Sequence, residues 1–176
     1  MLLTIWKSTM EDDERLGEER QVMEVKLIVN GVSESLEVEP GETLLDTLRM
    51  RVGLSGVKQS CDYGGCGACT VIADGKTVYS CMTLALKLSG ARITTVEGLE
   101  NNGKLSPLQQ LFVEKWALQC GFCTPGILMS AKCLLDTNPN PTEEVIREAL
   151  SGHVCRCTGY ARIIDAITEA ARSQKI

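Results

Sequence analysis

Nine cysteines are the residues of this 176-residue chain best suited to metal or redox chemistry. Eight of them fall into two groups. The first cysteine group is Cys61, Cys66, Cys69 and Cys81, and the second cysteine group is Cys120, Cys123, Cys155 and Cys157. In a chain without an export signal, clustered thiols more often bind metal or do redox chemistry than form disulfides. Both groups are therefore candidate metal sites.

The first cysteine group has the spacing C-x4-C-x2-C, and eleven residues separate its third and fourth members. This spacing is typical of a plant-type [2Fe-2S] cluster. Gly64, Gly65 and Gly67 lie among its first three cysteines. Glycine lets such a loop wrap tightly, so that backbone N–H groups point at the cluster sulfurs. We predict an iron–sulfur cluster here. The alternatives are a zinc site or inert buried thiols, although structural zinc sites usually use two C-x2-C-type knuckles.

The second cysteine group reads C-x2-C, then 31 residues, then C-x-C. Spacing alone fits either a zinc site or an iron–sulfur cluster. We favour a cluster because the first group already predicts one in the same chain. A C-x-C pair can present both thiolates to one iron, or bridge two irons, if Arg156 points away. The spacing does not reveal which thiols share an iron.

Two hairpins and a short helix are expected to position the first cysteine group. Alternating apolar residues on both sides of Asn30-Gly31 predict a hairpin over 23–39 with a type I′ turn. Leucines at helical spacing predict a helix over 43–51. A second hairpin is expected to turn at Asp74-Gly75, and a further strand to cover 92–96. This pattern predicts a small mixed sheet with at least one helix.

Four short helices are expected to carry the second cysteine group. Ser106 precedes a proline and Gln109, the arrangement of a capping box at a helix start. Further start signals occur at Thr124-Pro125 and Thr142, and apolar residues repeat at helical spacing from Ala161. Four helices joined by short loops predict a compact bundle.

The composition divides the chain into three parts. Residues 1–22 carry a net charge of −3 out of −5 and are expected to form a mobile acidic leader. Residues 23–98 and 99–176 are expected to form two small domains, each of a size that often needs a metal to stabilise it. The leader has the features of neither a signal peptide nor a twin-arginine signal, so we expect a cytoplasmic protein.

Several functions are excluded by the composition. The net charge is −5 and the cations are not clustered, which argues against a nucleic-acid partner. No apolar run approaches the roughly 18 residues of a membrane span. The sequence also contains neither a nucleophile–base pair nor a dinucleotide-binding glycine motif. Catalytic residues are therefore expected in partner chains rather than in this one.

Three motifs occur in a fixed order along the chain. They are Cys61-Asp62-Tyr63-Gly64-Gly65-Cys66-Gly67-Ala68-Cys69-Thr70, Gln119-Cys120-Gly121-Phe122-Cys123-Thr124-Pro125-Gly126 and Cys155-Arg156-Cys157-Thr158-Gly159-Tyr160. Together they resemble the small iron–sulfur subunit of the xanthine oxidase family of molybdenum hydroxylases. The resemblance implies an α+β fold, in which an N-terminal ferredoxin-like β-grasp module precedes an all-α four-helix bundle module. It also implies one [2Fe-2S] cluster in each module.

The resemblance assigns roles to individual residues. Cys61, Cys66, Cys69 and Cys81 resemble the ligands of the cluster nearer FAD, and Cys120, Cys123, Cys155 and Cys157 those of the cluster nearer molybdenum. Cys157 matches the ligand nearest the pterin, and Gln119 matches a glutamine whose amide hydrogen-bonds to the molybdopterin. His153 departs from the asparagine of many relatives. We hypothesise that its imidazole titrates near neutral pH and tunes the neighbouring cluster.

The same resemblance implies a function and partners. The chain would relay single electrons between the molybdenum–pterin cofactor of a large subunit and the FAD of a medium subunit, in a dimer of heterotrimers. Because the chain ends 19 residues after Cys157, we expect these cofactor domains to be separate chains. Two alternatives are a free-standing soluble ferredoxin with two clusters and a zinc-stabilised interaction module without a redox role.

Two further residues are given structural interpretations. Cys133 lies beside leucines in the second expected helix of the bundle, where a free thiol usually packs as a small hydrophobe. Trp116 continues the apolar stripe of the first expected helix of the bundle. We expect Trp116 in the core or at a subunit interface rather than in an electron relay.

Overall fold

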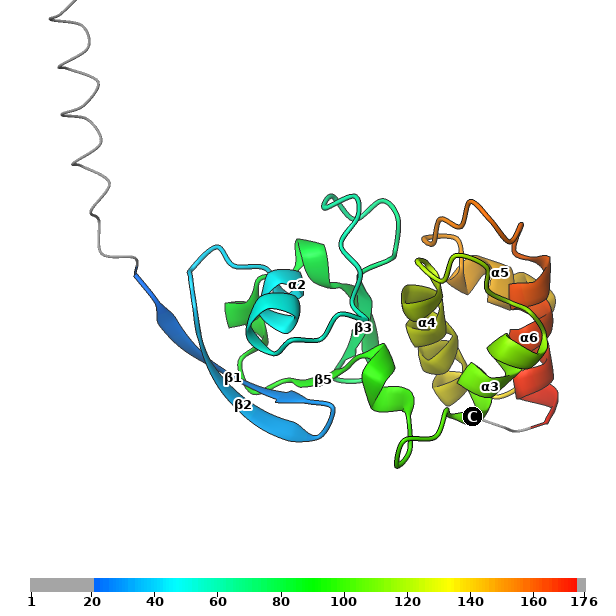
Figure 1. The fold of residues 1–176 in the computed structure, drawn as a ribbon, viewed down its shortest axis with the longest axis horizontal. Helices are drawn as coiled ribbons and strands as arrows, with labels where there is room; N and C mark the ends of the chain where they lie inside the picture. Colours follow the sequence, from blue (N-terminus) through cyan, green and yellow to red (C-terminus); the bar gives the residue numbers. More distant parts are fainter. Residues whose placement is uncertain (1–20, 174–176) are drawn as a thin grey trace, which may run out of the picture.

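The computed structural model describes residues 21–173. Nearly all of the expected acidic leader, residues 1–20, lies outside the described residues. Within them, the first half of the chain forms a five-stranded mixed sheet with short helices, and the second half contributes four α-helices (Figure 1). The fold is therefore a mixture of sheet and helix, as the sequence predicts.

The sheet has the strand order β2-β1-β5-β3-β4. Its strands are β1 (Met23–Val29), β2 (Val32–Val38), β3 (Thr70–Ala73), β4 (Lys76–Tyr79) and β5 (Arg92–Thr94). Strands β1 and β5 are parallel, and the other neighbours are antiparallel. Both predicted hairpins are confirmed. Asn30 and Gly31 have φ values of 50° and 86°, which are the two positive angles of a type I′ turn.

The expected helix over 43–51 has two parts. It begins as α2 (Leu44–Asp46), capped by the Thr43 hydroxyl, and continues as a π-helical turn, η2 (Thr47–Arg51). Short 3-10 turns follow β4 and flank β5, namely η3 (Ser80–Met82), η4 (Ala85–Leu88) and η5 (Val96–Leu99). Buried leucines of the α2–η2 segment pack with the sheet in one apolar core. This core supports the loop between η2 and β3, which carries three cysteines of the first group.

The second half contains α3 (Pro107–Glu114), α4 (Thr124–Thr137), α5 (Glu143–Ala149) and α6 (Ala161–Arg172). The predicted capping box is present, because Ser106 accepts from the Gln109 N–H while the Gln109 side chain accepts from the Ser106 N–H. The Thr142 side chain caps α5 by accepting from the Val145 N–H. All four helices contribute buried side chains to a second apolar core. This core holds the loops that carry the second cysteine group.

Trp116 differs from its expected place in the apolar stripe. Helix α3 ends before it, and its side chain is 81% exposed. The Trp116 N–H donates to the Val113 carbonyl and the Ala117 N–H donates to the Phe112 carbonyl, which is the Schellman pattern of a helix end. That pattern requires a left-handed residue, and Trp116 has a φ of 55°. The backbone therefore turns Trp116 out of the core, leaving the other expected location, a subunit interface.

The two halves meet where α4 packs against β3 (Figure 1). The Val154 N–H donates to the Cys66 carbonyl over 3.0 Å, and the Tyr79 hydroxyl donates to the Gly152 carbonyl over 3.4 Å. The half-buried Cys133 lies at the same junction, with its Sγ 3.4 Å from the Gly75 carbonyl oxygen. These contacts bring the cysteine-bearing loops of the two halves next to each other.

Candidate metal centres

The first cysteine group lies at the edge of the sheet. Cys61 and Cys66 are half-buried in the loop after η2, Cys69 is buried just before β3, and Cys81 is buried on η3. The Ser80 hydroxyl donates to the Cys69 carbonyl over 2.8 Å and ties η3 to the loop. As a result, the Sγ atoms of Cys69 and Cys81 are 3.3 Å apart.

The loop of the first cysteine group is wrapped so that its backbone faces its own sulfurs. The Tyr63 N–H is the strongest influence on Cys61 and, with the Cys66 thiol and the Gly65 N–H, lowers the pKa of Cys61 to about 7. A Cβ on Gly67 would lie 2.5 Å from His153 Nδ1 and 2.6 Å from the Gly152 carbonyl oxygen. Only glycine fits there, because this loop packs closely against the Gly152–His153 segment of the second half.

The buried Cys81 thiol of the first cysteine group resists ionisation, in contrast to Cys61. Burial, together with the neighbouring Cys69 thiol, raises the pKa of Cys81 to about 12. Two adjacent buried thiols cannot both ionise unless a cation is present. Metal binding supplies that cation and displaces the thiol protons.

The second cysteine group lies where loops meet the starts of helices. Cys120 and Cys157 are exposed, and their Sγ atoms are 3.6 Å apart. Cys123 is buried at the N-cap of α4, where burial and the Cys155 thiol raise its pKa to about 12. Burial also acts against ionisation of Cys155, but hydrogen bonds from the Thr158 hydroxyl and N–H outweigh it and lower the pKa of Cys155.

The thiols of each group meet two by two. The pairs are Cys61 with Cys66, Cys69 with Cys81, Cys120 with Cys157, and Cys123 with Cys155. The Sγ separations of 3.3 and 3.6 Å exceed the ~2.05 Å of a disulfide. They approach the ~3.7 Å edge of a tetrahedron with metal–sulfur bonds of about 2.3 Å. Pairs of thiols at these distances fit two metal ions per group, the donor arrangement of a [2Fe-2S] cluster.

A site for a single ion is not found in the part of the chain that the structure describes. Across residues 21–173, no three His, Cys, Asp or Glu side chains gather around a point where one metal ion could sit. Instead of surrounding one point, the thiols of each group lie in two pairs. The donor set and the glycine-lined loop therefore agree with the cluster chemistry predicted from the cysteine spacing.

Gln119 and His153 lie beside the second cysteine group. Gln119 is exposed, and its Nε2 donates to the Cys157 carbonyl over 3.1 Å, so it links the loops of two candidate ligands. His153 is buried, with Nε2 2.7 Å from the Ser130 hydroxyl oxygen. Burial lowers the pKa of His153 to about 4. Its imidazole is therefore neutral at neutral pH, and the hypothesis that it titrates there is wrong.

No role was predicted from the sequence for Thr158 and Tyr160, whose hydroxyl groups lie near Cys155. Thr158 Oγ1 lies 3.0 Å from Cys155 Sγ. Tyr160 Oη accepts the Cys155 N–H and donates to the His153 carbonyl, each over 2.8 Å. The available signal was the position of both hydroxyls three and five residues after a candidate ligand. That signal does not show where the side chains point, which depends on the turn into α6.

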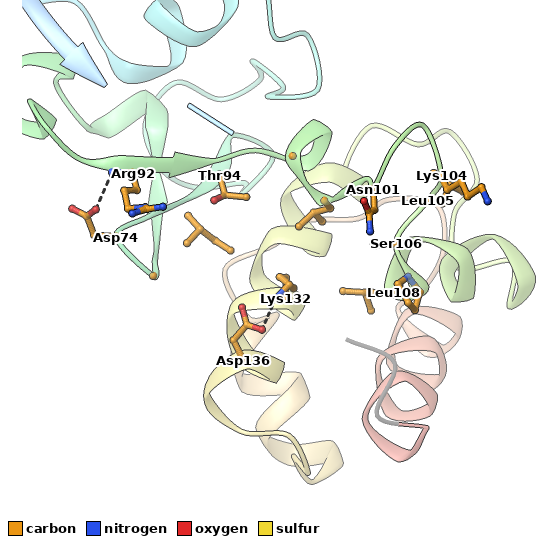
Figure 2. A pocket seen from close by; sticks show the side chains of 15 residues that line it. Asp74, Arg92, Thr94, Asn101, Lys104, Leu105, Ser106, Leu108, Lys132 and Asp136 are labelled. Atoms are coloured by element: carbon orange, nitrogen blue, oxygen red, sulfur yellow. Dashed lines mark hydrogen bonds and ion pairs between the residues drawn. The ribbon is translucent and has the colours of Figure 1, made fainter. Parts of the chain in front are cut away.

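A cavity of about 680 Å³ lies away from the cysteines, between strands β3 and β5 and helix α4 (Figure 2). Its lining includes Asp74, which accepts the Arg92 N–H, and Lys132, which pairs with Asp136 one helical turn away. No cysteine lines it. These charged groups are thus neutralised or bonded within the wall of the cavity.

Two family models match the chain. A 2Fe-2S iron-sulfur cluster binding domain matches residues 27–97, and a [2Fe-2S] binding domain matches residues 95–168. Each match contains one of the two cysteine groups. The protein is therefore an iron–sulfur protein with two [2Fe-2S]-binding domains.

Known proteins define the family more closely. The chain is 51% identical to the nicotine 6-hydroxylase small subunit of Paenarthrobacter nicotinovorans, over 84% of this chain and 89% of that protein. It is 49% identical to the nicotinate dehydrogenase small FeS subunit of Eubacterium barkeri, over 83% and 93%. In a crystal structure of quinoline 2-oxidoreductase from Pseudomonas putida 86, a chain with 47% identity superimposes with a TM-score of 0.84, covering 89% of this chain and 99% of that one.

This chain accordingly belongs to the small iron–sulfur subunits of the xanthine oxidase family of molybdenum hydroxylases. The resemblance drawn from the three cysteine motifs is confirmed. Like these relatives, the protein is a subunit of an oxidoreductase complex. Along residues 21–173, no helix combines the length and the apolar character of a bilayer span.

Proposed function

We propose that this chain relays single electrons between the molybdenum–pterin cofactor of a large subunit and the FAD of a medium subunit. The observation that carries this proposal is the pairing of thiols at 3.3 and 3.6 Å in two separate groups. A [2Fe-2S] cluster exchanges one electron at a time. Two such clusters divide the two-electron chemistry of the partner subunits into single steps.

The thiol pairs support a specific assignment of ligands. In the first cluster, Cys61 and Cys66 share one iron, and Cys69 and Cys81 share the other. In the second cluster, Cys120 and Cys157 share one iron, and Cys123 and Cys155 share the other. The Sγ atoms of Cys69 and Cys81 and those of Cys120 and Cys157 are 3.3 and 3.6 Å apart, which suits two thiolates on one metal ion, and the other two pairs are also in hydrogen-bond contact.

The exposure of the thiols supports the order of the clusters. Cys120 and Cys157 are exposed, whereas Cys123 is buried. The outer iron of the second cluster would therefore face the large subunit, with Cys157 nearest the pterin and the Gln119 amide beside it. The first cluster would serve the FAD of the medium subunit. The hydrogen bond between Val154 and Cys66 joins the two ligand loops between these ends.

Exposed apolar side chains around both cysteine groups support the proposed partners. Tyr63 and Met82 are exposed beside the first group, and Trp116 and Phe122 beside the second. Large apolar side chains gathered next to a functional site are typical of protein interfaces. We assign the first pair to the contact with the medium subunit and the second to the contact with the large subunit, in a dimer of heterotrimers in the cytoplasm.

The two apolar cores support the proposed domains. One core holds the sheet and the α2–η2 segment, and the other holds helices α3 to α6. We assign residues 23–98 to a ferredoxin-like β-grasp domain and residues 99–176 to a helical domain built as a four-helix bundle. Each domain would then bury one side of its cluster in its own core.

The test is metal analysis of the complex purified without oxygen. We expect about four irons and four sulfides per small subunit, and two distinct electron paramagnetic resonance (EPR) signals after reduction. Cys69→Ser should remove one signal, whereas Cys133→Ser, a matched change outside both groups, should leave both. A colourless, zinc-loaded chain would reject the proposal. A chain that carries both clusters but never co-purifies with larger subunits would support the free-standing ferredoxin instead.

A further inference from the structure

Cys155 is surrounded by hydroxyl groups in a way that no other candidate ligand is. We propose that the Thr158 hydroxyl donates a hydrogen bond to the Cys155 sulfur and raises the reduction potential of the second cluster, with Tyr160 fixing the direction of that bond. This inference rests on the proposed function, because it requires Cys155 to ligate iron. Thr158 and Tyr160 would then be positioning residues for electron transfer.

The direction of the bond follows from the partners of Thr158. Its Oγ1 lies 3.0 Å from Cys155 Sγ and accepts the Tyr160 N–H over 3.2 Å. A hydroxyl has one proton to donate. An iron-bound thiolate has no proton and can only accept. The Thr158 proton must therefore point at the sulfur, and the Thr158 N–H, 3.5 Å from the same sulfur, adds a second and longer contact.

Tyr160 holds this geometry from two sides. Its phenol oxygen accepts the Cys155 N–H and its phenol proton goes to the His153 carbonyl, each over 2.8 Å. The residues before and after Val154 are thus both hydrogen-bonded to the Tyr160 hydroxyl. The Cys155 N–H is bonded to the phenol, and the Thr158 hydroxyl is the nearest donor to the Cys155 sulfur, with longer backbone N–H contacts from Thr158 and Cys157 beside it.

The backbone of Tyr160 is strained in a way that serves the same arrangement. Its φ of 66° is left-handed, which is uncommon for a bulky residue. This conformation turns its N–H back to Thr158 while its carbonyl accepts the first helical bond of α6, from the Ile164 N–H over 2.9 Å. Strain of this kind persists where the surrounding bonds over-determine it, and it is frequent at functional sites.

The two clusters would consequently differ in their hydrogen-bond donors. Among the described residues, Thr158 supplies the only side-chain hydroxyl within hydrogen-bond distance of a candidate ligand sulfur, whereas the Cys61 sulfur receives backbone N–H groups. A donor to a ligating sulfur stabilises the more negative, reduced cluster and raises its potential. The Thr158 hydroxyl would thus help to set which cluster holds the electron.

The experiment compares Thr158→Val with Thr158→Ser in the whole complex. Valine keeps the shape of threonine and removes the hydroxyl, whereas serine keeps the hydroxyl. The potentials are measured by a redox titration followed by EPR. We expect valine to change the equilibrium for sharing one electron between the two clusters about tenfold, which corresponds to lowering the potential of the second cluster by ~59 mV. The first cluster should not move, and serine should restore the potential of the second.

A second measurement does not depend on the valine variant. In the unaltered complex, pulsed EPR after exchange into D₂O should detect an exchangeable proton strongly coupled to the second cluster. The strong coupling of the hydroxyl proton should be present in Thr158→Ser and absent in Thr158→Val, or in Thr158→Ala if valine prevents cluster assembly, whereas the weaker coupling of the Thr158 N–H should remain in all variants. Equal potentials in all variants, or no such proton in the unaltered complex, would overturn the inference. Missing iron in the unaltered complex would instead reject the proposed function, so iron content is measured first.

Discussion

The contact between the two halves of the chain predicts an unusual response to Gly126→Ala. A Cβ at position 126 would lie 2.2 Å from the Gly67 carbonyl oxygen and 3.2 Å from the Gly67 carbonyl carbon. An ordinary contact between such atoms is about 3.5 Å. The added methyl group must therefore gain more than 1 Å of room, and the obstacle is backbone rather than a flexible side chain.

The expected size of the effect follows from two opposing contributions. Gly126 lies inside α4, where alanine alone should stabilise the helix by about 0.5–1 kcal/mol. Forcing a methyl group into a closely packed contact destabilises by about 1–3 kcal/mol, and the upper end applies because α4 and the backbone at Gly67 must separate. The net loss should be about 2 kcal/mol, or ~4–8 °C in thermal midpoint for a chain of this size.

The assay is thermal unfolding of the purified complex, followed by the visible bands of the clusters and by calorimetry. Gly41→Ala is the matched control, because a Cβ there meets nothing within 4 Å and its backbone is not left-handed. That variant should change the free energy of unfolding by no more than about 0.5 kcal/mol. If Gly126→Ala is as stable as the parent or more stable, helix propensity dominates and the close contact does not have the energetic role assigned to it.

Three further predictions concern single side chains. A hydrogen bond from Arg51 lowers the pKa of Glu42 below 4.5, so the pair stabilises the fold above that pH and less as the pH falls. Urea midpoints of Glu42→Gln and the parent should therefore differ at pH 7 and converge in acid. Trp116→Gly should remove the strain of a non-glycine residue in the left-handed conformation and so stabilise the subunit by about 1 kcal/mol. The same change should weaken co-purification of the subunit with the large subunit. A destabilised variant would contradict the helix-end argument. Cys133→Ser should cost less than about 2 kcal/mol by calorimetry, because the thiol is only half-buried at the junction.

Much of the fold could be predicted from the sequence because the residues that determine it are close together in the chain. Asn30-Gly31 specifies its hairpin turn through its own backbone angles, and Ser106 with Gln109 specifies a helix start through bonds within four residues. The cysteine spacing predicted the cluster chemistry in the same way, because most of the plant-type pattern lies within one short segment of the sequence. The assignment of each thiol as a ligand stays a prediction for the metal analysis to test.

Other features were not readable because they depend on contacts between distant segments. Trp116 follows an apolar stripe, but the Schellman turn at the end of α3 points it outward. His153 belongs to a polar loop by sequence, yet packing against Gly67 and Ser130 buries it and keeps it neutral. Neither result follows from the neighbours of these residues in the chain.

The sequence by itself predicted which atoms would bind metal, namely eight thiols in two groups, with glycines where the backbone must come close. Only the tertiary structure decided how those thiols pair. Cys120 meets Cys157, and Cys123 meets Cys155, because α4 and α6 share one core and bring two loops together. Spacing along a chain limits distance but does not set direction, and the direction of each sulfur is set by the packing of the helices beneath it.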